Sequence, residues 1–340
     1  MAITAAMVKE LRELTGAGMM DCKKALGETD GNMDEAVEYL RKNGQAKAEK
    51  KASRIAAEGL CTVVVKDDNK TAAVVEVNSE TDFVAKNEKF QAFVEAVAAQ
   101  AIDTDAADIE AFLNEAWAAD TSKTVNEELA SMIATIGENM NIRRFEKVSC
   151  DNGIVVDYIH AGGKIGVLVA AETDSTSDAV VECLKNVAMQ VAAMNPMALD
   201  EASVPQEVRD NEFNVAVEKT KEEQVKKAVD NALRKAGFNI YISETEEHLN
   251  EGIMKGLITE AQADEIRAVK AKVTKEKLAN LPEQMILNIA NGRMAKFYKE
   301  VCLLRQEYIQ DAKMSVAAYL KSVNKDLTVV AFRRFTLRAE

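Results

Sequence analysis

The sequence predicts an α+β protein in which one strand-and-helix unit occurs twice behind a small helical module. The tripeptide Glu80-Thr81-Asp82 follows a strand of alternating apolar residues and precedes a helix with apolar periodicity. The same three residue types return at Glu172, again between a strand and a helix, which indicates an internal repeat. A long charged stretch with helical periodicity interrupts the second copy at residues 206–281, and it predicts a coiled-coil-like insertion.

Composition narrows the class of protein before any motif is considered. The chain has 340 residues, of which 47% are hydrophobic and 29% are charged, so two or three globular domains are expected. A net charge of −13 argues against direct nucleic-acid binding, because such affinity comes largely from Lys and Arg neutralising phosphates. The 5 cysteines are widely spaced beside only 2 histidines, so we expect a reduced compartment and no zinc site. With neither a signal peptide nor a membrane span evident, we expect a cytoplasmic protein.

The N-terminal region, residues 1–45, predicts a compact three-helix module. Gly16 is expected to end the first helix and Gly44 the third, while Asn32 can cap the start of the third. Residues 46–56 are basic and rich in alanine, with neither proline nor glycine. They predict a helical linker to the first copy of the repeat.

The first copy is expected over residues 57–150. Its two opening strands lead into the corner at residues 80–87, and a long helix follows, capped by Asn87. This corner carries an additional apolar turn that the second copy lacks. A protruding Phe83 on an acidic corner suggests a side chain that enters another molecule. The strands are expected at Leu60–Val65, Ala72–Val77 and Ile142–Ser149.

The second copy is expected over residues 151–205 and 282–340, on either side of the arm. The helix that begins after Pro282 is expected to end at Asn291 and Gly292. The strands are expected at Ile154–His160, Ile165–Ala171, Phe297–Leu303 and Thr328–Leu337.

The sequence contains no motif of a nucleotide-binding or hydrolytic enzyme. A Walker loop, GxGxxG, HExxH and GxSxG are all missing. His160 ends a strand beside a glycine turn, and by itself it would be a surface histidine. We therefore predict a protein-binding role with no catalytic residue, no metal and no cofactor.

Four segments of the sequence carry a resemblance to a known family, namely Leu11–Leu26, Val77–Asn87, Ile136–Phe145 and Tyr158–Val169. In this order they resemble the bacterial translation elongation factor Ts family. The resemblance covers about residues 1–205 and resumes from about 282 to 337. Two departures stand out: the region 206–281 is longer than the short helical hairpin usual there, and the chain stops just after its final strand, without the C-terminal helical module of some members.

This resemblance implies a guanine-nucleotide exchange factor. It would bind elongation factor Tu, both GDP-bound and nucleotide-free, and promote release of Mg²⁺ and GDP so that GTP can enter. A homodimer within a heterotetramer is a further implication, and neither a cofactor nor a membrane is involved. The residues implied in displacing Mg²⁺ are Thr81, Asp82, Phe83 and Val84, and the other implied partner contacts are Lys23, Lys51, Ile136, Gly137 and His160.

Two alternatives stay open at this stage. The first is an adaptor, in which a ubiquitin-associated-like module and a scaffold bind a partner helix without any exchange activity. The second is an α+β enzyme, for which no acid or base is evident. Single residues also have structural interpretations, with Phe83 packed beneath its own helix, Ile136 in the core and Gly137 as a helix C-cap.

Overall fold

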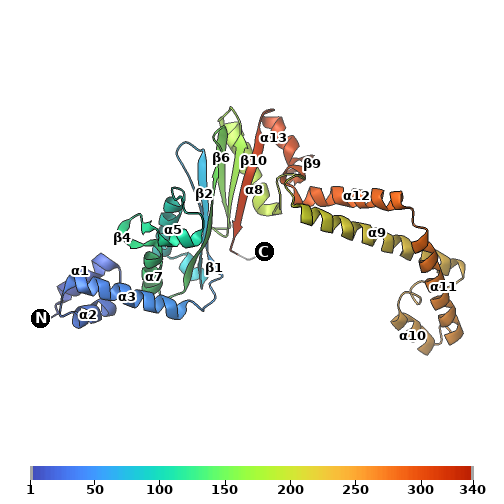
Figure 1. Ribbon diagram of the computed structural model, residues 1–340, viewed down its shortest axis with the longest axis horizontal. Helices are drawn as coiled ribbons and strands as arrows, with labels where there is room; N and C mark the ends of the chain where they lie inside the picture. Colours follow the sequence, from blue (N-terminus) through green and yellow to red (C-terminus); the bar gives the residue numbers. More distant parts are fainter. Residues whose placement is uncertain (1–2, 338–340) are drawn as a thin grey trace. The chain divides into compact units, whose positions relative to one another are not determined.

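The computed structural model describes residues 3–337 and confirms the α+β class. The chain divides into two compact units, one made of Met1–Leu199 with Glu307–Glu340 and the other of Asp200–Gln306. Figure 1 follows the elements along the sequence. No helix within residues 3–337 is long and apolar enough to cross a membrane.

The predicted three-helix module is present, but its third helix is longer than expected. Its helices are α1 (Ala5–Thr15), α2 (Met19–Glu28) and α3 (Met33–Lys51). Gly16 ends α1 with a positive φ, as predicted, and the Asn32 side chain caps α3. The prediction that Gly44 ends α3 is wrong, and much of the expected linker is helical. Gly44 instead lies buried inside α3 and faces Ala130 and Ala134 of α7 (Val125–Ile136), and the helix continues through it to Lys51.

Two antiparallel sheets of three strands make up the predicted repeat. The first has the order β1-β2-β5 and the second the order β10-β7-β6. Buried residues from both sheets form one cluster, which includes Val74 of the first sheet and Leu168 and Phe335 of the second. The strands are β1 (Glu58–Val65), β2 (Thr71–Ser79), β5 (Met140–Ser149), β6 (Gly153–His160), β7 (Ile165–Glu172) and β10 (Thr328–Thr336).

The repeat extends to a short hairpin in each copy, which the sequence did not predict. In each copy a long helix packs on the sheet, then a short hairpin and another helix lead to the closing strand (Figure 1). In the first copy these are α5 (Glu88–Ala101), β3 (Ala116–Trp117), β4 (Asp120–Thr124) and α7, with the short α6 (Ile109–Asn114) before the hairpin. In the second they are α8 (Asp178–Met194), β8 (Glu307–Tyr308), β9 (Asp311–Ser315) and α13 (Val316–Val323).

The unit Asp200–Gln306 contains the predicted arm, in which α9 packs along both α11 and α12. Its outer part has its own apolar core, with Leu233, Leu249 and Ile266 buried. The helices are α9 (Gln206–Lys235), α10 (Glu246–Met254), α11 (Glu260–Ala279) and α12 (Glu283–Val301), followed by the 3₁₀ turn Leu303–Arg305.

Two predictions for α12 are wrong. The helix does not end at Gly292, and the expected strand Phe297–Leu303 is mostly the last turn of α12 and the 3₁₀ turn. Ile286, Ala290 and Met294 recur every fourth residue and are all buried. A single interior glycine costs only about 1 kcal/mol, so this apolar face continues the helix through it.

We expect Gly59→Ala in β1 to destabilise the fold by about 3 kcal/mol. Gly59 has φ +130, and a Cβ there would lie 2.1 Å from the Val77 carbonyl oxygen. Gly292→Ala is a matched control, because nothing lies within 4 Å of a Cβ at Gly292 in α12. The control should stabilise by about 0.5–1 kcal/mol. Urea unfolding of both variants checks this, and equal effects would contradict it.

Candidate functional site

The corner after β2 is a one-turn helix, α4 (Asp82–Ala85), and its side chains point in opposite directions. Thr81 caps the helix, with its hydroxyl oxygen accepting from the Val84 N–H at 3.4 Å. Val84 is 7% exposed and belongs to the apolar core of the first copy, whereas Phe83 is 79% exposed. The interpretation of Phe83 as packed beneath its own helix is therefore wrong. The turn buries Val84 and leaves the Phe83 ring in solvent.

Opposite charges flank the exposed Phe83 ring. Lys86 Nζ lies 2.9 Å from Asp82 Oδ2 and 6.0 Å from the centroid of the Phe83 ring. The hydrogen bond from Lys86 holds the pKa of the Asp82 carboxyl below its usual value, and the charge of Lys164 acts in the same direction. The corner therefore presents an aromatic ring beside an ion pair.

The turn after α7 is bonded to this corner. Gly137 ends α7 with φ +94, which confirms it as a helix C-cap. Ile136 is half-buried and packs against the core of the first copy. The Lys51 ammonium, at the end of α3, donates to the Gly137 carbonyl oxygen. Glu138, the next residue, accepts hydrogen bonds from Thr81. Ile136, Gly137 and Lys51 are thus brought together with the corner.

His160 lies at the exposed end of β6, and its Nδ1 is 3.0 Å from the Tyr158 hydroxyl. The turn that follows it adjoins β1, because the Gly163 carbonyl accepts from the Cys61 N–H at 2.6 Å. The same turn carries Lys164, the cation that acts on Asp82. This turn therefore lies beside β1, the strand that α4 also contacts.

Lys23 is the one predicted contact that the fold places apart from the others. It is exposed on α2 of the N-terminal module, and within residues 3–337 no hydrogen bond or ion pair joins it to the corner. Met19 and Met20 on the same helix are 58% and 73% exposed. These side chains give the module an adaptable apolar surface of its own.

Sequence reasoning did not single out Glu138, Arg54 or Lys164 as residues of this site. Glu138 lies inside the segment Ile136–Phe145 that carries the family resemblance, so a signal for it was present. Its partner Thr81 is 57 residues away, and no local pattern predicts that pairing.

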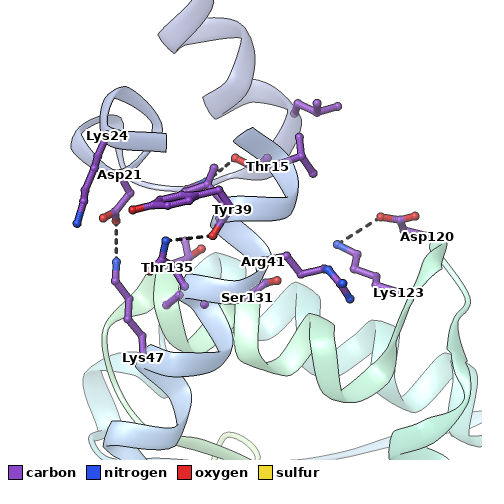
Figure 2. A pocket seen from close by; sticks show the side chains of 18 of the residues that line it. Thr15, Asp21, Lys24, Tyr39, Arg41, Lys47, Asp120, Lys123, Ser131 and Thr135 are labelled. Atoms are coloured by element: carbon purple, nitrogen blue, oxygen red, sulfur yellow. Dashed lines mark hydrogen bonds and ion pairs between the residues drawn. The ribbon is translucent and has the colours of Figure 1, made fainter. Parts of the chain in front are cut away.

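A separate cavity of about 520 Å³ lies between the N-terminal module and the helix α7. Figure 2 shows charged side chains around it from the N-terminal module and from β4, with Asp21 paired to Lys47 and Asp120 to Lys123. None of the predicted site residues lines this cavity. Each ion pair is neutral within itself, and the lining residues come from the N-terminal module, β4 and α7, so the cavity lies at an interface within the chain.

The side chains that could bind a metal ion do not form a cluster within the described part of the chain. All five cysteines are free and buried. Across residues 3–337, no group of three or more His, Cys, Asp or Glu side chains could hold a metal ion.

Comparison with known proteins gives one consistent family. A profile of the family described as "Elongation factor TS" matches residues 80–339. A relative from Parabacteroides distasonis named "Elongation factor Ts" is 44% identical over 341 residues, which cover 100% of both chains. A relative of the same name from Phocaeicola vulgatus is 44% identical, with 100% of both chains covered. Another from Clostridium novyi is 42% identical, with 98% of this chain and 92% of the relative covered. Because the first two alignments span whole chains, they include residues 206–281.

Proposed function

The chain belongs to the elongation factor Ts family, and we propose that it is the guanine-nucleotide exchange factor for elongation factor Tu. Family membership makes it a translation elongation factor. In the proposed reaction it binds the GDP-bound partner, promotes release of Mg²⁺ and GDP, and leaves a nucleotide-free complex that GTP enters. No covalent step is required, and the reaction takes place in the cytoplasm without direct contact to nucleic acid.

The exposed Phe83 ring is the observation that carries this proposal. Moving a Phe side chain from water into an apolar site is worth about 1.5–3 kcal/mol. Mg²⁺ demands near-ideal octahedral geometry, so a small displacement of an element that holds it weakens its binding. Burial of Phe83 in the partner supplies the free energy for that displacement. By linkage, the factor then weakens nucleotide binding as much as the nucleotide weakens binding of the factor.

The remaining predicted contacts extend the proposed surface around the corner. Ile136, Gly137 and His160 would face the nucleotide-binding domain of the partner, with His160 near its phosphate loop. Lys51 donates to the Gly137 carbonyl, so it also supports this surface from within the chain. Lys23 would make a separate contact through the N-terminal module.

Release of labelled GDP from elongation factor Tu tests the proposal directly. We expect the intact protein to accelerate release at least tenfold, which corresponds to about 1.4 kcal/mol. Gel filtration of the same mixture reports whether a complex forms, and whether it is a heterodimer or a heterotetramer. A stable complex with unchanged GDP release would favour the adaptor, and it would contradict the exchange function.

A further inference from the structure

The one-turn helix α4 does not contain enough internal bonding to fix its own shape. Isolated helices shorter than about 12 residues are marginal in water, and α4 spans only Asp82–Ala85. At its start the bonds from Ala85 N to the Thr81 carbonyl and from Val84 N to the Thr81 hydroxyl are both 3.4 Å long. Shorter bonds close only its end, from Lys86 N to the Phe83 carbonyl at 3.2 Å and from Asn87 N to the Val84 carbonyl at 2.9 Å. The shape that exposes Phe83 therefore depends on contacts from elsewhere in the chain.

Glu138 supplies the most direct of these contacts. The Thr81 N–H donates to Glu138 Oε2 at 3.0 Å, and the Thr81 hydroxyl donates to Glu138 Oε1 at 2.8 Å. Both oxygens of one carboxylate are thus bonded to the residue that caps α4. Hydrogen bonds to a charged acceptor are about twice as strong as neutral ones.

Neighbouring residues strengthen the same junction. The Asn139 N–H donates to Glu80 Oε1 at 2.5 Å, and Arg54 forms an ion pair with Glu80 at 3.4 Å. The Asn139 side chain in turn donates to the Arg54 carbonyl at 2.7 Å. Residues 138 and 139 therefore hold residues 80 and 81 by both backbone and side-chain groups.

The second copy of the repeat offers a comparison within the same molecule. There Thr173 occupies the position of Thr81, but its hydroxyl donates to the Ser175 carbonyl at 3.2 Å and accepts from the Ser175 N–H. Its own N–H donates to the Asn152 carbonyl. Among the described residues, no carboxylate is bonded to Thr173, and no one-turn helix follows it. The bond between this threonine and a carboxylate is therefore found in the first copy, which is the copy that exposes a phenylalanine.

We propose that Glu138 is a positioning residue, which binds Thr81 and so holds α4 in the conformation that presents Phe83 to the partner. This inference rests on the proposed exchange function. Glu138 acts through Thr81 and makes no contact with the nucleotide. Its effect on exchange should therefore require an intact Phe83.

Glu138→Ala should lower the maximal rate of GDP release from elongation factor Tu about tenfold, as expected for loss of a charge-assisted contact. Glu115→Ala is the matched control, because Glu115 is also half-buried in the first copy and accepts from the hydroxyl of a threonine, Thr104. The control should leave the rate unchanged. In a Phe83→Ala background, Glu138→Ala should have no further effect. An undiminished effect in that background would overturn the proposal.

Amide hydrogen exchange of the free protein provides a readout that needs no partner. Glu138→Ala should accelerate exchange in peptides covering residues 80–87 about tenfold, whereas Glu115→Ala should not. Unchanged protection in Glu138→Ala would overturn the positioning role. If the intact protein failed to accelerate GDP release, the exchange function would fall, while this measurement would still decide whether Glu138 orders the corner.

Discussion

Phe83→Ala is expected to reduce the acceleration of GDP release by at least tenfold while leaving the free protein as stable as before. The loss corresponds to the burial of one Phe side chain, about 1.5–3 kcal/mol. The free energy of unfolding should change by less than about 0.5 kcal/mol, because the Phe83 side chain is 79% exposed and does not belong to a core. Stopped-flow GDP release and thermal unfolding measure the two effects separately.

Phe93→Ala is the matched control for this prediction. Phe93 lies on α5, is 4% exposed and packs with its ring centroid 5.8 Å from that of Trp117. The same truncation should here cost about 3–5 kcal/mol of stability. A loss of stability in Phe83→Ala comparable to that in Phe93→Ala would show that Phe83 belongs to the core.

Arg144→Ala is expected to give the largest loss of stability from a charged residue, about 3–5 kcal/mol. Its partner Glu76 on β2 is fully buried, and Arg144 Nε lies 2.7 Å from Glu76 Oε2. The guanidinium also lies 4.1 Å from the centroid of the Phe335 ring on β10. Truncation would leave the buried carboxylate with the more distant Arg143, whose Nη1 lies 3.7 Å from Glu76 Oε1, and it would remove a contact between the two sheets. Urea unfolding measures the cost.

Two further variants test that explanation. Lys9→Ala removes one partner of the exposed pair Lys9–Glu13, so its effect should be under about 1 kcal/mol. Combining Arg144→Met with Glu76→Gln removes both charges, and it should recover part of the stability lost in Arg144→Ala. If Arg144→Ala lowered the stability as little as Lys9→Ala does, the explanation would be wrong, because the buried Glu76 carboxylate would not need Arg144 for stability.

Periodic apolar patterns predicted the helices and strands that bury one face. Glycine marked the end of α1 at Gly16 correctly, but it was wrongly taken as the end of a helix at two other positions. Gly44 and Gly292 both lie inside helices that continue through them, where α3 packs on α7 and α12 packs on α9. The strands β3 and β8 have only two residues each, too few for any periodic pattern.

The exposed side chain of the candidate site was predictable from the sequence, whereas the contacts that hold it were not. The additional apolar turn at Phe83, compared with the second copy of the repeat, predicted a protruding side chain, and the ring is exposed. The junction between Thr81 and Glu138 joins residues that are distant in the sequence, so only the fold reveals it. The same holds for the pairing of Arg54 with Glu80.

We propose that Phe83 accelerates nucleotide release by loosening the Mg²⁺ bound to the partner. The most direct test compares the intact protein with Phe83→Ala in GDP release from elongation factor Tu, first in millimolar magnesium and then with the magnesium chelated. We predict at least a tenfold difference between the two proteins with magnesium present and almost none without it. An equal difference under both conditions would contradict the claim.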